Sequence, residues 1–234
     1  MGAKKIRIKL QEEGIVASPK RISKLMREMG LACVSTRART RVYRRPNNDT
    51  SLQNRLNQKF TQEAPNLVWV TDITYVKINA TTTYYVCAVI DLFSRKVVSC
   101  LASKKIDVNF VAKTFMAAYK SRGEPTSLML HSDRGIQFVA FTFMRILRKL
   151  GVRQSFSNTG YPYDNAVVEA FFSAMKKEEI YQNQCTSFEQ LRKTVADYVE
   201  YYNEVRPHQT LGYKTPNQVE AIYAEQANKL SDIA

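Results

Sequence analysis

Apolar runs of strand length recur along this chain. They are rich in β-branched and aromatic residues, which favour β-strands. Three of them follow closely on one another, and only the four residues 92–95 separate the second from the third, which is the length of a hairpin connection. The pattern predicts strands over residues 68–78, 84–91 and 96–101.

Helical spacing begins after this predicted meander and then alternates with strand-like runs. Residues 107–122 place Phe110, Val111, Phe115 and Ala118 on one helical face. Three strands followed by alternating helix and strand indicate an α/β domain. The remaining predicted elements are strands at 127–130 and 152–155, helices at 140–150 and 188–202, and a weak helix after Val219.

Two short basic helices are predicted near the N-terminus. The first covers residues 4–13. The second starts at Ser18-Pro19, with Ser as N-cap and Pro at the first helical position, and ends at Gly30. The pair is either a DNA-contacting, helix-turn-helix-like arm or a plain helical hairpin, and the charge of this region favours the arm.

Positive charge is concentrated at the N-terminal end. The 234 residues carry a formal net charge of +14, and residues 1–61 hold 15 Lys and Arg against 4 Asp and Glu. Such an arm beside a nearly neutral domain indicates a polyanionic partner, most simply DNA, and the alternative is a solubilising face. Five arginines follow the helices and are candidate phosphate contacts: Arg37, Arg39, Arg41, Arg44 and Arg45.

Residues 35–64 show no apolar period. We interpret them as a linker that becomes ordered on DNA, and the alternative is a disordered tether. The four cysteines form no C-x-x-C pair, and with only two histidines no zinc-finger spacing exists. Scattered cysteines, with no signal peptide or apolar run of membrane-spanning length, predict a cytoplasmic protein.

Three acidic residues stand in or beside apolar segments. Asp72 interrupts the first predicted strand, Asp133 follows the strand at 127–130, and Glu169 lies early in a helix that Asp164 or Asn165 would cap. A carboxylate in such a setting is unfavourable unless something pairs with it. Oxygen ligands of this kind are what Mg²⁺ prefers, so the three residues are candidate metal ligands.

The sequence around these acids resembles a known family. The words W-V-T-D-I-T-Y, H-S-D-R-G-I-Q-F, D-N-A-V-V-E-A-F-F and Y-N-E-V-R-P-H-Q-T-L-G-Y-K-T-P are similar to those of the second-frame (OrfB-type) transposases of the insertion-sequence-three family, which have a retroviral-integrase-like catalytic core. Asp72, Asp133 and Glu169 match the DDE motif of that family, with 35 residues between the last two. Lys176 matches the basic residue often found after the glutamate.

The resemblance implies a ribonuclease-H-like domain, with a mixed five-stranded sheet flanked by helices, behind a small basic helical arm. It implies the boundaries 1–45 for the arm, 46–64 for a linker, 65–222 for the catalytic domain and 223–234 for a tail. It further implies two Mg²⁺ ions, with Mn²⁺ as substitute, held by the three acids. The implied activity is cleavage of the 3′ ends of a mobile element and their joining to target DNA, by a homo-oligomer on DNA and with help from a first-frame helix-turn-helix protein.

Further DNA contacts are predicted around this core. Lys176 and Lys177 follow Glu169 by two turns, and Glu169, Ser173, Lys176 and Ile180 share one helical stripe. Tyr161 and Tyr163 lie in the loop before that helix, where they would stack on bases or pack on the domain. Arg206 and His208 would bind phosphate or lock the C-terminal segment in place. His131 would orient the Asp133 loop or pack there, and Asp91 is interpreted as a turn residue.

Two other functions are compatible with parts of the sequence. A truncated, non-catalytic DNA-binding protein would compete for element ends, although the intact triad argues against this. A tyrosine recombinase would use one of the 13 tyrosines, but no H-x-x-R motif occurs in a suitable setting. Dependence of DNA cleavage on a divalent metal separates these functions from a DDE enzyme.

Overall fold

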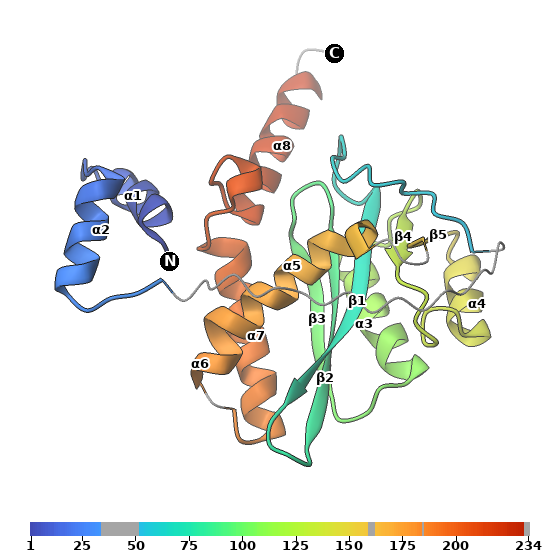
Figure 1. The fold of residues 1–234 in the computed structure, drawn as a ribbon. Helices are drawn as coiled ribbons and strands as arrows, with labels where there is room; N and C mark the ends of the chain where they lie inside the picture. The colour runs from blue at the N-terminus through green and yellow to red at the C-terminus, as the bar shows by residue number, and fades with distance from the viewer. Residues whose placement is uncertain (34–51, 159–161, 184, 232–234) are drawn as a thin grey trace.

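A five-stranded mixed sheet forms the centre of the protein in this computed structural model, which describes residues 1–33, 52–158, 162–183 and 185–231. The strand order is β3-β2-β1-β4-β5, with β1 in the middle (Figure 1). β1 to β3 form an antiparallel meander, and β4 and β5 run parallel to β1. The strands are β1 (Val68–Lys77), β2 (Thr83–Asp91), β3 (Val97–Ser103), β4 (Met129–Ser132) and β5 (Arg153–Phe156).

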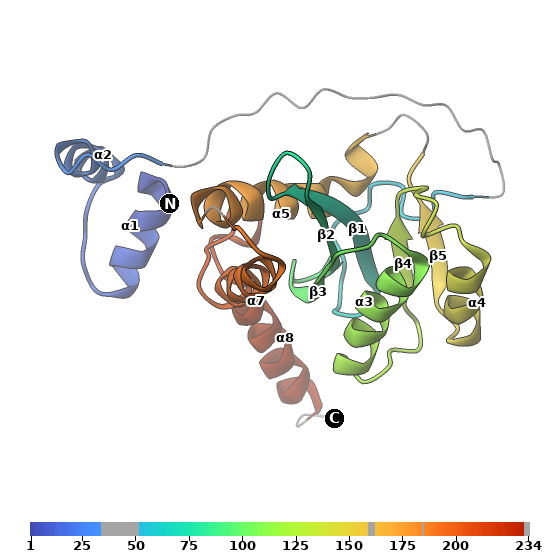
Figure 2. The same ribbon diagram turned by 90° about the horizontal axis from the view of Figure 1, so that it is seen from below.

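Helices cover both faces of this sheet. Figure 2 shows α3 and α4 on the opposite side of the strands from α5 and α7. The helices of the domain are α3 (Val108–Ser121), α4 (Phe141–Lys149), α5 (Ala166–Met175), α6 (Tyr181–Asn183), α7 (Phe188–Glu204) and α8 (Pro216–Ser231), with short 3-10 turns at Pro162–Asn165 and Gln209–Leu211 and a π-helical turn, η2 (Lys176–Ile180).

The two faces contain separate apolar clusters, as the period-two pattern of a strand requires. Val86, Ala88 and Ile90 of β2 pack in one cluster with α5 and α7, while Cys87 and Val89 pack in the other with α3 and α4. The predicted ribonuclease-H-like sheet is confirmed. The strand predicted at 127–130 lies two residues later in the structure, where β4 runs from Met129 to Ser132. Leu128 is buried just before it.

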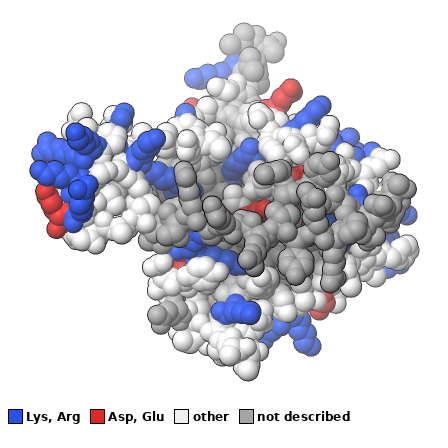
Figure 3. Space-filling model, in the orientation of Figure 1, with Lys and Arg blue, Asp and Glu red and all other residues white. Residues whose placement is uncertain are grey.

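The N-terminal helices agree with the prediction from sequence. α1 (Ala3–Glu12) and α2 (Pro19–Glu28) pack on one another, and Gly14 and Gly30 follow them with φ of 78° and 67°. The Ser18 side chain accepts a hydrogen bond from the Arg21 amide at 3.2 Å, which confirms it as the N-cap of α2. In Figure 3, Lys and Arg side chains gather over these helices.

The segment before β1 packs on the domain. Leu56 is 1% exposed and belongs to the same apolar cluster as Val168 of α5. This packing differs from the linker predicted for residues 35–64. The five candidate arginines between 37 and 45 lie outside the described residues, so their contact with DNA stays a prediction, as do the predicted domain boundaries.

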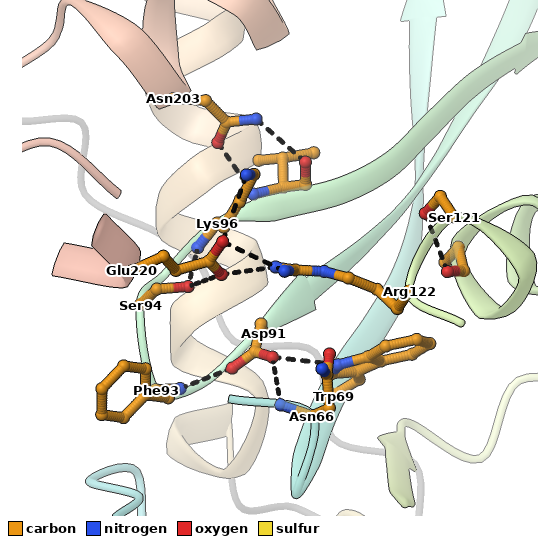
Figure 4. A network of polar contacts seen from close by, with 12 residues as sticks. Asn66, Trp69, Asp91, Phe93, Ser94, Lys96, Ser121, Arg122, Asn203 and Glu220 are labelled. Carbon is orange, nitrogen blue, oxygen red and sulfur yellow. Dashed lines mark hydrogen bonds and ion pairs between the residues drawn. The ribbon is translucent and has the colours of Figure 1, made fainter. Parts of the chain in front are cut away.

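α8 is longer and more firmly attached than the weak helix predicted after Val219. Its Glu220 lies between Ser94, Lys96 and Arg122 (Figure 4). The side chains of Glu220, Lys96 and Arg122 are only partly exposed. Ser94 Oγ donates at 2.8 Å, Lys96 Nζ at 3.1 Å, and the Arg122 guanidinium through both terminal nitrogens. One carboxylate thus joins α8 to the β2–β3 turn and to the end of α3.

A second carboxylate in the same view holds the start of β1. Asp91, which is fully buried, accepts hydrogen bonds from the Asn66 amide at 2.7 Å, from Trp69 Nε1 at 3.1 Å and from the Phe93 amide at 2.8 Å (Figure 4). The Phe93 bond agrees with the interpretation of Asp91 as a turn residue, and the other two extend its role to β1. None of the described helices is long and apolar enough to cross a membrane.

Replacing Glu220 by Gln tests the attachment of α8. The change leaves Arg122 and Lys96 without their shared anion, so we expect a loss of about 2–3 kcal/mol in the free energy of unfolding. Against the effect of burial, Arg122 holds the pKa of Glu220 below its usual value. The carboxylate therefore stabilises the fold above its unfolded pKa, and that stability disappears as pH falls through the folded pKa.

Urea unfolding at pH 7 measures the loss. Glu225→Gln is the matched control, because this residue is exposed on the same helix. Equal stability of the Glu220 and Glu225 variants would contradict the assigned role of Glu220.

Candidate active site

Asp72 and Asp133 lie side by side because of strand pairing. β1 and β4 are parallel, with Val68 opposite Met129 and Val70 opposite His131, so extending the register by two residues sets Asp72 beside Asp133. Side chains alternate along a strand, and Asp72 has the parity of Val68 and Val70, which face α5. The two carboxyl groups are therefore on the sheet face that α5 covers.

Glu169 reaches this region from α5. Its neighbours Val168 and Phe172 are buried against β1 and β2, which fixes the helix across the sheet, while Glu169 itself remains exposed. The charges of Asp133 and Glu169 both act on Asp72, and the charge of Asp133 acts on Glu169. The structure therefore brings all three predicted acids into one electrostatic group.

The pKa values reflect this crowding. Burial, followed by the charge of Asp133, raises the pKa of Asp72 well above its usual value. Burial also raises the pKa of Asp133, and the Gly135 amide opposes that shift. Partial desolvation and then the charge of Asp133 raise the pKa of Glu169. Like charges in a partly buried site disfavour one another, so a cation placed among them would be strongly attracted.

Each aspartate is also engaged locally. Asp72 Oδ1 accepts from the Ile73 amide at 2.7 Å, and Asp133 Oδ1 accepts from the Gly135 amide at 2.9 Å. Among the described residues, no three His, Cys, Asp or Glu side chains are close enough as placed to hold a metal ion. Convergence of the three acids on one ion would therefore need some of these groups to move from their present positions.

Gly135 lies close against the Asp133 carboxylate. A Cβ atom at this position would lie 2.9 Å from Asp133 Oδ1, closer than real Cβ contacts allow. The absence of a side chain lets the carboxylate fold back onto the backbone of the loop after β4.

A cation and an aromatic ring complete the site. Lys176 Nζ lies 4.9 Å from the centroid of the Tyr75 ring, and the Tyr75 side chain is 61% exposed. Burial lowers the pKa of Lys176, and the charge of Asp72 opposes this shift. The lysine is thus near the acids, as its spacing from Glu169 predicted. The role of Tyr75 was not predicted, although it lies three residues after Asp72 within the W-V-T-D-I-T-Y word.

The π-helical turn η2 changes the predicted helical stripe. Glu169 and Ser173 are exposed, but Ile180 is 4% exposed and packs in the core. Wider winding over Lys176–Ile180 rotates Ile180 away from the face it would share with Glu169 in a regular α-helix. The prediction that Ile180 belongs to that stripe is therefore wrong.

His131 is a buried, neutral packing residue beneath the site. Its Nδ1 lies 2.9 Å from Ser155 Oγ, and its Nε2 lies 3.2 Å from Ser157 Oγ. Burial lowers the pKa of His131 to about 4, so the ring is uncharged at neutral pH. Since both nitrogens are engaged by serines, the ring joins β4 to β5 just before Asp133.

The two predicted helix caps serve other purposes. Asn165 occupies the N-cap position of α5 but makes no capping bond, and its Nδ2 donates to the Thr71 carbonyl of β1 at 3.3 Å. Asp164 accepts three hydrogen bonds from elsewhere, from Asn54, Gln58 and the Asn158 amide. The capping prediction was wrong because both side chains have long-range partners that local sequence does not reveal.

Arg206 is held by a carboxylate. Its guanidinium donates to both oxygens of Glu178 at 2.7 Å, it lies over the Tyr202 ring, and its side chain is 14% exposed. His208 is buried, and its Nε2 lies 3.2 Å from the Tyr202 carbonyl. These contacts fit the alternative in which the R-P-H word locks the C-terminal segment.

The structure describes less of the other residues that were predicted to contact DNA, which are Lys177, Tyr161 and Tyr163. Lys177 is half-buried at the start of η2. Tyr161 and the side chain of Tyr163 lie outside the described residues. Contact of all these residues with DNA stays a prediction.

The donor set fits a hard divalent cation. Its three candidate ligands supply carboxylate oxygens only, and the adjacent histidine is already bonded to two serines. Oxygen ligands with room for waters and phosphate oxygens are what Mg²⁺ uses. The fold and the site together define the class of integrase-like proteins with an acidic, metal-compatible centre.

Comparison with known proteins places the chain more closely. Models described as integrase core domains match residues 62–162 and 150–216, and an HTH-like domain model matches residues 1–39. The transposase for insertion sequence element IS904 of Lactococcus lactis is 34% identical over 220 residues, covering 94% of this chain and 87% of the relative. Transposase InsF for insertion sequence IS3A of Escherichia coli is 32% identical over 220 residues, covering 94% and 76%.

Solved structures agree on the fold. The HTLV-2 integrase catalytic core domain, determined in complex with magnesium, aligns with a TM-score of 0.53 and 21% identity over 67% of this chain and 97% of that chain. The simian T-cell lymphotropic virus intasome structure, in complex with the PP2A regulatory subunit B56 gamma, gives a TM-score of 0.58 at 18% identity over 94% and 70%. The chain belongs to the insertion-sequence-three family of transposases, which combine an HTH-like domain with an integrase core.

Replacing Asp72 by Asn tests the crowding of the acids. A folded-state pKa raised above the unfolded value means that stability is greatest below the unfolded pKa of about 3.9 and falls as pH rises through the folded pKa. The amide side chain of the Asp72→Asn variant does not ionise, so the variant does not lose stability in this way as pH rises. We expect it to be more stable than the wild type by at least about 1 kcal/mol at pH 7 in EDTA.

The gain should shrink towards pH 4, where the wild-type carboxyl is protonated. Urea unfolding of both proteins at pH 4 and pH 7 gives the comparison. A difference in stability that is the same at both pH values would show that the charge of Asp72 is not the cause.

Proposed function

We propose that this protein is a DDE-type polynucleotidyl transferase that cleaves the 3′ ends of a mobile insertion element and joins them to target DNA. The observation that carries the proposal is the placement of Asp72, Asp133 and Glu169 in one electrostatic group on the α5 face of the sheet. Membership of a transposase family and an integrase-like fold support the reaction class.

The positions of the three acids suggest how they would be shared between two metal ions. Asp72, central on β1, would bridge two Mg²⁺ ions, with Asp133 completing one ligand set and Glu169 the other. When bound, two such ions, or Mn²⁺ in their place, supply Lewis-acid activation of the attacking hydroxyl and stabilisation of the leaving 3′ oxygen. The chain itself positions the acids, excludes bulk water beneath them and needs no protein nucleophile.

DNA is the proposed partner. The basic helices α1 and α2 belong to an HTH-like domain, and phosphate contacts by Lys and Arg add affinity without reading sequence. Lys176, which lies over the Tyr75 ring near the acids, would contact a phosphate at the reacting end. Assembly as a homo-oligomer on DNA and help from a first-frame helix-turn-helix protein remain part of the proposal.

Conservative replacement of each acid is the decisive test of the reaction class. Asp72→Asn, Asp133→Asn and Glu169→Gln should each reduce 3′ cleavage and strand joining by on the order of a thousandfold, because each removes a metal ligand worth several kcal/mol in the transition state. Folding and DNA affinity should stay close to wild type. Cleavage of labelled element-end DNA and a gel-shift assay provide the two measurements.

Matched controls are the exposed acids Asp197→Asn and Glu200→Gln on α7, which should cleave normally. Mg²⁺ and Mn²⁺ should support the reaction, while Ca²⁺ should permit binding with little chemistry because its coordination is looser. Wild-type activity in EDTA would refute metal catalysis and favour a covalent recombinase. DNA binding without cleavage under any metal would favour the non-catalytic competitor.

Lys176→Ala tests the proposed contact beside the acids. Loss of one phosphate contact should lower DNA affinity and flatten the slope of log affinity against log salt by about 0.9 for duplex DNA. Lys176→Arg should keep both, since the charge and the stacking on Tyr75 survive. Fluorescence anisotropy at several salt concentrations measures the slope.

Lys193→Ala, an exposed lysine on α7, is the control and should leave the slope unchanged. An unaltered slope for Lys176→Ala would assign Lys176 to the protein surface rather than to DNA.

A further inference from the structure

Residues 52–58, which we call the strap, cross the edge of β5. The Gln53 carbonyl accepts from the Phe156 amide at 3.0 Å, and Ser155 Oγ accepts from the amides of Arg55 and Leu56 at 2.9 and 3.0 Å. Leu56 fills the apolar cluster below α5. The strap is thus tied by backbone bonds and by a buried side chain to the edge of the sheet nearest the acids.

One end of the strap contacts the loop that carries Asp133. Arg134, the residue after Asp133, donates from its terminal guanidinium nitrogen to the Leu52 carbonyl at 3.0 Å. Its Nε donates to the Ser157 carbonyl at 3.0 Å. The arginine side chain therefore links the β4 loop both to β5 and to the strap.

The other contact is with the start of the Glu169 helix. Asn54 Nδ2 donates to Asp164 Oδ2 at 2.8 Å, and Gln58 Nε2 donates to Asp164 Oδ1 at 2.9 Å. The Asn158 amide donates to the same carboxylate at 2.8 Å. Asp164 immediately precedes Asn165, the N-cap residue of α5, so these bonds set the position from which the helix starts.

Asp164 depends on these donors. It is 1% exposed, and none of the ion pairs found among the described residues includes it. A buried carboxylate is strongly unfavourable unless hydrogen bonds satisfy its oxygens. Among the described residues, two of the groups that donate to it are strap side chains more than a hundred residues away in sequence. The strap and the start of α5 therefore hold one another in place.

We infer that the strap is a positioning element of the active site, with Asn54, Gln58 and Asp164 as positioning residues for Glu169 and with Arg134 as the positioning residue for Asp133. The inference rests on the proposed function, since it treats both acids as metal ligands. Groups that orient metal ligands typically alter metal affinity or activity by about 10–100-fold when they are removed. The strap thus contacts both the loop that carries Asp133 and the start of the Glu169 helix.

A rescue experiment on the full chain separates positioning from general stability. Gln58→Glu sets a carboxylate against Asp164 and breaks the contact. In the double variant Gln58→Glu/Asp164→Asn, the new amide donates to the new carboxylate, which restores a hydrogen bond of reversed direction. Gln62→Glu is the matched control, because Gln62 lies just beyond the strap and its amide bonds to the Lys59 carbonyl rather than to Asp164.

Two readouts are compared. In EDTA, hydrogen exchange of the α5 amides should be about tenfold faster in Gln58→Glu and near wild type in the control and in the double variant. The Mg²⁺ concentration at half-maximal thermal shift should rise about tenfold in Gln58→Glu and return to within about twofold of wild type in the double variant. Val111→Ala, a core change in α3, should lower the melting temperature without moving the Mg²⁺ midpoint.

Unchanged exchange and an unchanged Mg²⁺ midpoint in Gln58→Glu would overturn the inference, and so would a defect that Asp164→Asn does not rescue. Failure of the proposed function looks different. If the wild type shows neither Mg²⁺-dependent stabilisation nor DNA cleavage, the metal site is refuted, while exchange at α5 still decides whether the strap positions that helix.

Discussion

The parallel pairing of β1 with β4 is the constraint on which the site depends. It sets Asp72 beside Asp133 and gives both the parity that faces α5. The same pairing makes the structure locally unfavourable, because two carboxyl groups with raised pKa values share a partly buried space. A sheet selected for stability alone would place apolar residues at both positions. Under the proposed function, a bound cation would relieve this repulsion.

The surroundings of the acids are arranged to tolerate this repulsion. Beneath them, His131 is neutral and bonded to two serines, so the floor of the site adds no charge. Beside them, the buried carboxylate of Asp164 has its hydrogen bonds satisfied by amides. Among the described residues, the cation whose charge acts on Asp72 is Lys176, which partly offsets the crowding of the acids.

Much of the fold was predictable because its signals are local. The apolar runs of β1 and β2, the Ser18-Pro19 cap of α2 and the buried face of α3 each follow from neighbouring residues. The acids were recognisable from the words around them. The roles of Asp164 and Glu220 were not, because Asn54 lies 110 residues from Asp164 and Ser94 lies 126 residues from Glu220. A polar residue with a distant partner looks like any cap or surface charge in the sequence.

The distant pairs share a physical role that explains why the site tolerates strain. Glu220 with Arg122 fixes α8 to α3, and Glu178 with Arg206 fixes the end of α7 to η2. Each of these two ion pairs is a mostly buried contact that lies outside the triad. Because breaking such a contact leaves an uncompensated charge, the pairs make opening of the C-terminal helices unfavourable. Opposite charges at the periphery thus resist opening of these helices, while the proposed chemistry keeps like charges together at the centre.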